Sequence, residues 1–177
     1  TTLFRGEIVA EGGTEGGNGG FAEVSGKGFL RFDGDVSLAS GIGGQNGVLL
    51  LDPDTITIQA ADPDINGDAT TGDDITALTD LDDAASDHTD ADSIITAGAV
   101  NTLLTGSNVL QLKAEELITV NAVITGAGTA SLLLEAPAIT LGANVTTGGM
   151  QTYNGIVTLD GSRTLAASTV KTMSTVD

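Results

Sequence analysis

Short segments in which apolar and polar residues alternate recur along the second half of the chain. Each carries an aliphatic pair at alternate positions: Leu110 and Leu112, Ile118 and Val120, Ile139 and Leu141, and Val157 and Leu159. Successive side chains of a strand point to opposite faces, so the two members of each pair share one face. Gly, Thr, Asn and Val dominate the sequence between and within these segments, and all four are weak helix formers. The pattern predicts short strands with one buried face.

These segments repeat with a period in the low twenties. Leu112 and Leu134 are 22 positions apart, and Val120 and Leu141 are 21 apart. Further copies run through residues 48–58, residues 155–165 and, more loosely, residues 29–38. A strand-based repeat of this length is typical of a parallel solenoid, in which successive copies stack and bury a continuous core. We therefore expect an all-β fold, a single β-solenoid domain over residues 1–177.

One segment has helical rather than alternating spacing. Val100, Leu103 and Leu104 lie at intervals of one helical turn, and Thr96 precedes them as a candidate N-cap. The spacing predicts a short helix near residues 96–105, which leads the chain back into the solenoid.

Residues 61–93 differ in composition from both flanking regions. Between Ala61 and Asp92 there are eleven Asp, no Lys or Arg, and the single histidine of the chain. We interpret this stretch as an acidic excursion, a loop inserted into the solenoid.

The charge balance argues against several partners. The chain has 24 Asp and Glu against 6 Lys and Arg, for a net charge of −18. Nucleic acids and anionic membrane surfaces are bound through clustered cations, so neither is an expected partner. The longest apolar run is four residues, Val48 to Leu51, whereas a membrane helix needs about 20. We expect no membrane insertion, and the absence of cysteine excludes disulfides and thiolate chemistry.

The excursion opens with the spacing of a calcium loop. Counting from the first position, the candidate ligands are Asp62, Asp64, Asn66, Asp68 and Asp73, with Gly67 at the sixth position. Calcium is held by six to eight oxygen ligands, and this twelve-residue spacing is the one that EF-hand loops use. Position twelve is an Asp, whose arm is shorter than that of Glu, and no helix precedes the loop. The alternative interpretation is a solvated acidic loop that binds no ion.

Three other candidate sites are weaker. His88 lies among Asp87, Asp90 and Asp92, and such a group could bind zinc or act as a base, but one histidine supports no Ser-His-Asp arrangement here. The glycines of residues 12–20 lack the Lys-Ser/Thr that follows a phosphate-binding loop, so we interpret them as a turn.

Paired carboxylates could in principle cleave a glycosidic bond. Asp33 with Asp35, and Asp52 with Asp54, are candidate pairs. Enzymes of that kind usually offer aromatic platforms, yet the chain has only Tyr153 and four Phe, of which we place Phe21, Phe29 and Phe32 in the core or in side-chain ladders. A polysaccharide-active enzyme is therefore a minor alternative, and we expect no catalysis.

Several motifs resemble a known protein family. Residues 16–26 read GGNGGFAEVSG, residues 48–58 read LLLDPDTITI after Val48, and residues 108–122 and 151–159 continue the likeness. These stretches are similar to large exoproteins of the filamentous haemagglutinin type, which are exported by two-partner secretion. The resemblance implies a right-handed parallel β-helix, an extracellular or bacterial cell-surface location, and a glycan or protein of a host or matrix surface as partner.

The sequence thus leads to two functional expectations. The first is a structural or adhesive segment of a bacterial surface or secreted exoprotein; because the chain begins at Thr1 without Met, we interpret it as a piece of a longer passenger. The alternative is a self-assembling extracellular filament subunit, in which the open ends of the solenoids associate through unpaired strand edges.

Overall fold

The computed structural model describes residues 2–28, 30–32, 34–60, 93–105 and 108–173. Within these residues the chain forms sixteen strands and one helix, α2 (Ala97–Leu103). The strands are β1 (Thr2–Phe4), β2 (Glu7–Val9), β3 (Phe21–Gly26), β4 (Leu30–Phe32), β5 (Asp35–Ser37), β6 (Val48–Pro53), β7 (Thr55–Gln59), β8 (Ser93–Thr96), β9 (Val109–Lys113), β10 (Leu117–Val120), β11 (Ile124–Thr125), β12 (Ser131–Leu141), β13 (Val145–Thr146), β14 (Met150–Leu159), β15 (Leu165–Ala166) and β16 (Thr169–Thr172).

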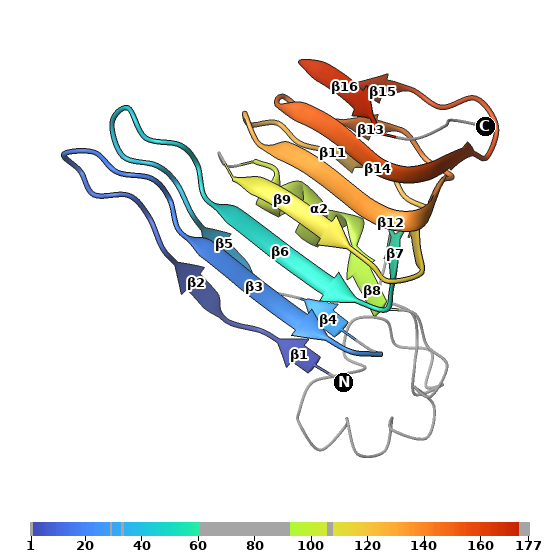
Figure 1. The fold of residues 1–177 in the computed structure, drawn as a ribbon, viewed down its shortest axis with the longest axis horizontal. Coiled ribbons are helices and arrows are strands. Elements are labelled where there is room, and N and C mark those ends of the chain that lie inside the picture. The colour runs from blue at the N-terminus through green and yellow to red at the C-terminus, as the bar shows by residue number, and fades with distance from the viewer. Residues whose placement is uncertain (1, 29, 33, 61–92, 106–107, 174–177) are drawn as a thin grey trace.

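Every pair of named strands is parallel, and the largest sheet contains nine strands. This sheet curls into two limbs. The first limb runs β3, β6, β9, β12, β14 and β16, and the second runs β8, β7, β10, β12 and β14. Strands β12 and β14 belong to both limbs because each is long enough to continue around the corner. Figure 1 shows the strands of the first limb lying side by side along the molecule.

The corner between the limbs lies at a break in the pairing of β12 with β14. Their register shifts between Glu135 and Ala138. On the β14 side of the break stands Gly155 with φ +153°, and a Cβ there would approach the carbonyl oxygen of Ala136 to 1.8 Å. Only glycine allows the two backbones to come this close.

A third ladder closes the repeat. It contains β2 with β5 and, further along, β11, β13 and β15, while α2 lies between them in contact with both β5 and β11. Each pass of the chain visits the first limb, the second limb and then this third ladder, and the next pass stacks on it. The fold is therefore mainly parallel β and solenoid-like, as the repeat predicts.

The core consists of inward-facing columns of aliphatic side chains. In the first limb Leu51, Leu112 and Leu134 follow one another in register, and each is fully buried. In the second limb Ile58, Val120 and Leu141 do the same. The separations of 22 and 21 residues predicted from sequence are thus the registers of β9 with β12 and of β10 with β12.

The predicted short helix is confirmed. Thr96 is its N-cap, with its hydroxyl accepting a hydrogen bond from the backbone N–H of Ala99 at 3.2 Å. The helix buries Val100 and Leu103, the residues whose spacing predicted it. Among the described residues, no helix has the length and apolar character needed to cross a membrane.

Before it enters α2 the chain forms a further strand, β8, parallel to β7, and the sequence did not predict this strand. This strand begins at Ser93, the last residue assigned to the acidic excursion, and pairs with β7 on the side away from β10. The Ser93 hydroxyl is buried, accepts from the N–H of Leu30 at 2.8 Å and donates to the carbonyl of Gly28 at 3.1 Å. Strand β8 is thereby held against the segment that contains β4.

Candidate functional site

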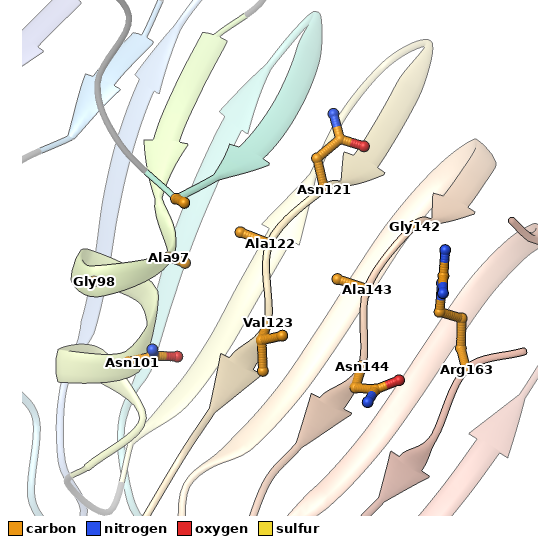
Figure 2. Close-up of a pocket in the computed structure, with 11 residues that line it drawn as sticks. Ala97, Gly98, Asn101, Asn121, Ala122, Val123, Gly142, Ala143, Asn144 and Arg163 are labelled. Atoms are coloured by element: carbon orange, nitrogen blue, oxygen red, sulfur yellow. The ribbon is translucent and has the colours of Figure 1, made fainter. Parts of the chain in front are cut away.

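An open groove lies at the corner between the second limb and the third ladder. Its volume is about 690 Å³. The residues that line it come from four successive levels of the stack: Ala60, Ala97, Gly98, Asn101, Asn121, Ala122, Val123, Gly142, Ala143, Asn144 and Arg163. Figure 2 shows them arranged from α2 on one side to Arg163 on the other.

Small side chains make the groove hollow. Its floor includes Ala97, Ala122 and Ala143, which are each no more than 8% exposed. At Gly142 a Cβ would lie 3.2 Å from the side-chain oxygen of Asn121 and from a backbone carbonyl, so a larger residue does not fit without displacement. Successive strands stack about 4.8 Å apart, and this tight spacing favours small residues where the chain turns a corner.

Asparagine amides line the groove and join neighbouring passes. The Oδ1 of Asn101 accepts a hydrogen bond from the N–H of Thr125 at 2.7 Å, and the Oδ1 of Asn144 accepts from the N–H of Thr164 at 2.9 Å. These side-chain hydrogen bonds join neighbouring passes at the corner, between the named strands of the two ladders. The amide nitrogens of both side chains remain donors for a bound molecule.

Arg163 provides the single charged side chain among the lining residues. Its Nη1 donates to the carbonyl of Ser162 at 3.3 Å, whereas its Nε is buried and has no hydrogen-bond partner. Figure 2 shows the side chain running alongside the segment from Gly142 to Asn144. The described lining residues offer hydrogen-bonding amides and one guanidinium, and they include no carboxylate, histidine or cysteine.

The predicted calcium ligands Asp62, Asp64, Asn66, Asp68 and Asp73 lie outside the described residues, as do His88, Asp87, Asp90 and Asp92. The calcium site therefore stays a prediction. Within the part of the chain that the structure describes, no group of three or more His, Cys, Asp or Glu side chains is arranged to hold a metal ion.

The candidate carboxylate pairs have different outcomes. Asp33 lies outside the described residues, so its pairing with Asp35 is not described. Asp52 is engaged by Lys113, whose Nζ lies 2.8 Å from Asp52 Oδ2. This hydrogen bond is the main reason that the pKa of Lys113 is raised.

Of the aromatic side chains named from the sequence, the structure describes Tyr153, Phe32 and Phe21. Tyr153 is fully buried and Phe32 is 1% exposed, which confirms the core placement of Phe32. Of the two placements predicted for Phe21, the core is wrong, because its side chain is 63% exposed, whereas a side-chain ladder agrees with its register. It occupies an outward position of β3, in register with Val48 on the outer face. Phe29 lies outside the described residues.

The glycine-rich stretch is a turn, as predicted. Residues 10–20 and 38–47 form two adjacent loops, which we call the paired glycine loops; Figure 1 shows them extending together beyond β3 and β6. The N–H of Gly12 donates to Ala39, that of Gly19 to Gln45, and that of Gly41 to Gly17. Since neighbouring carbonyls occupy these N–H groups, they are not free to cradle a phosphate.

Sequence reasoning missed the groove. A signal was present, because a small residue next to Asn recurs at Asn121-Ala122 and at Ala143-Asn144, with the two alanines 21 positions apart, the same interval as Val120 and Leu141. No sequence pattern of this kind places Arg163 in the groove, because its position there depends on the register of the passes.

Comparison with protein-family models, with curated proteins and with solved structures gave no match. The likeness to filamentous haemagglutinin-type exoproteins therefore stands on the residues quoted above.

Proposed function

We propose that this chain is a right-handed parallel β-helix and that it serves as a structural or adhesive segment of a bacterial cell-surface or secreted exoprotein. The observation that supports the proposal best is the set of inward columns that continue in register from pass to pass. The column through Leu49, Leu110 and Leu132 shows this, with every member no more than 1% exposed. Such a core grows by repetition along one axis, which suits a long stiff spacer.

The outer surface of the second limb supports the same proposal. Thr119, Thr140 and Thr158 follow one another in register on the outward side of β10, β12 and β14. Their hydroxyl and methyl groups form an uncharged, regular strip. A surface of this kind offers hydrogen bonds to a flat partner without the cost of desolvating charges.

The groove supports the adhesive part of the proposal. It offers amides and one guanidinium over an alanine floor, and these groups bind polar molecules without reacting with them. A glycan or protein of a host or matrix surface is the class of partner that we propose.

Two measurements on one preparation test the proposal. Brief protease treatment of intact producing cells should release peptides from residues 1–177, and beads coated with the purified chain should adhere to host-cell or matrix surfaces. Beads coated with the Leu112→Asp variant, in which the column is broken, serve as the control and should not adhere. If the protease cleaves the chain only after the cells are lysed, the proposed cell-surface location is wrong. If both types of bead adhere equally, the proposed adhesive role is wrong.

The self-assembling filament is a second proposal. Among the described strands, β3 and β16 each pair on one side only, and such edges favour the addition of another strand. The net charge of −18 opposes association, so fibres are expected at high ionic strength first. Electron microscopy of the purified chain across a salt series separates fibres from single rods; single rods at every salt concentration would exclude this second proposal.

A further inference from the structure

We infer that the groove binds a small organic carboxylate and that Arg163 is the group that anchors it. The inference rests on the adhesive function proposed above and names the chemistry of the molecule that this surface would hold. It requires a cation with unused donors, surroundings free of competing carboxylates, and neighbouring groups that accept the rest of the ligand.

Arg163 meets the first requirement. A guanidinium carries five N–H donors, and the structure assigns one hydrogen bond to it, from Nη1 to Ser162. Its Nε is the one buried side-chain polar atom without a partner in the part of the chain that the structure describes. The buried Nε is covered by protein atoms, whereas Nη2 has no hydrogen-bond partner among the described residues and provides the donors for a ligand. A carboxylate matches the planar fork of a guanidinium better than any other common anion in proteins except phosphate.

The surroundings of Arg163 meet the second requirement. None of the acidic residues that the structure describes lines the groove. A bound carboxylate therefore meets no acidic side chain among the lining residues. The net charge of −18 still repels extended polyanions from the molecule as a whole. These two facts together favour a small ligand with a single carboxylate.

The remaining lining residues indicate what else the ligand carries. Asn144 places an amide group near Arg163, and Figure 2 shows Asn121 on the other side of the Gly142 to Asn144 segment. The Oδ1 of Asn144 is already bonded to Thr164, so its Nδ2 is the group left to donate. A volume of about 690 Å³ is much larger than a simple carboxylate needs. A carboxylate attached to a hydroxyl-bearing ring fills this space better than acetate does.

Titration with three probes tests the inference and distinguishes a simple organic acid from a carboxylate attached to a hydroxyl-bearing ring. We expect D-glucuronate to shift the backbone amide signals of the groove residues in a saturable way at low ionic strength, acetate to do so more weakly, and D-glucose to have no effect. Equal affinity for acetate and glucuronate would still support the carboxylate anchor but would limit the ligand to a simple acid. Binding of glucose as tight as that of glucuronate would overturn the inference.

Two matched pairs of variants locate the site. Arg163→Gln should weaken glucuronate binding about tenfold or more, whereas Lys171→Gln, which removes a cation of β16 outside the groove, should change it less than about twofold. Arg163→Lys keeps the charge without the planar fork and should fall between them. Unchanged affinity in Arg163→Gln, or equal losses in the Arg163 and Lys171 variants, would contradict the anchor.

The second pair leaves Arg163 in place. Val123 lines the groove and is 55% exposed, and Val9 is 60% exposed and lies outside it. Val123→Glu should weaken binding by repelling the carboxylate, while Val9→Glu adds the same charge elsewhere and should not. Loss of binding in both would indicate a general charge effect and overturn the site. If the folded wild-type chain shows no saturable shift with any probe, the inference is wrong, while the surface location tested above is unaffected.

Discussion

The paired glycine loops and the inward columns of β9, β12 and β14 hold neighbouring passes together in opposite ways. In the columns, side chains such as Leu112 and Leu134 stack in register and are removed from water. In the loops the backbones themselves touch, because a Cβ at Gly19 would lie 1.9 Å from the carbonyl oxygen of Leu38 and one at Gly44 would lie 2.0 Å from that of Gly17. The comparison shows that one solenoid-like stack is stabilised by buried area in one region and by close backbone hydrogen bonding in another.

The largest expected effect comes from breaking a column. Leu112→Asp places a carboxylate between Leu51 and Leu134, where no described cation pairs with it. A buried unpaired charge costs about 3–5 kcal/mol in free energy of unfolding, enough to unfold many domains. Chemical denaturation followed by circular dichroism measures it. Gln111→Asp, one position away on the outward face, is the matched control and should cost less than about 1 kcal/mol.

The next effect comes from filling the contact between the loops. Gly19→Ala forces the backbone of Leu38 to move, and we expect a loss of about 2–3 kcal/mol. Gly98→Ala is the control, because the nearest atom to its Cβ would be the Thr96 hydroxyl at 3.8 Å. In the helix, alanine is favoured over glycine by up to about 1 kcal/mol, so this variant should be unchanged or more stable. Equal destabilisation by both would mean that close approach does not hold the loops.

Near the carboxyl-terminal end of the columns, Tyr153 and Gln151 form a buried polar cluster, which is a third way of holding neighbouring passes together. The Tyr153 hydroxyl donates to Gln151 Oε1 at 2.9 Å, and Gln151 Nε2 donates to the carbonyls of Val145 and Ala166. Tyr153→Phe leaves the buried amide oxygen of Gln151 without its donor and should cost about 1–2 kcal/mol in stability. Thermal and urea unfolding at neutral pH measure this loss.

The same tyrosine predicts a pH dependence. Burial raises the pKa of Tyr153 above that of an exposed tyrosine, which is about 10. Below that value the residue is neutral in the folded and unfolded chain alike, and the stability is fully present. As the pH rises past about 10, the unfolded chain loses the proton first, so the free energy of unfolding falls. A wild-type and a Tyr153→Phe stability profile between pH 8 and 11 should therefore converge at the alkaline end; a constant difference would contradict the prediction.

The smallest effect is expected on the outer surface. The pair of Lys113 and Asp52 joins neighbouring strands of the first limb, with side chains 39% and 22% exposed. Because water and salt screen such a pair, Lys113→Gln should lower stability by only about 0.2–1 kcal/mol, and less at high salt. A double-mutant cycle with Asp52→Asn measures the interaction; a coupling as large as the loss in the Leu112 variant would invalidate the distinction between core and surface.

The sequence predicted the columns and the helix because both depend on local spacing. Alternation fixes which face of a strand is buried, and the repeated interval of 22 residues fixes the register of Leu112 with Leu134. Likewise, Thr96 and the apolar residues after it determine α2 without reference to the rest of the chain.

The place of β8 and the groove could not be predicted in this way. Ser93, Ile94, Ile95 and Thr96 do not alternate polar and apolar residues, so the sequence shows neither that β8 is a strand nor that it pairs with β7 on the side opposite β10. Arg163 reaches the groove only because the pass that contains it stacks on the pass of Asn144. Both facts depend on which segments become neighbours, and alternation carries no information about that choice.

The return of β8 also affects the straightness of the stack. In the first limb β3 and β6 are direct neighbours, whereas in the second limb β8 intervenes between the level of β4 and that of β7, and in the third ladder α2 takes the place of a strand. Two sides of the molecule therefore gain thickness at one level, about 4.8 Å for the added strand, while the third side gains none. If the chain forms part of a longer rod, as proposed above, we expect these unequal sides to bend the rod at this level, so that surfaces before and after it face different directions.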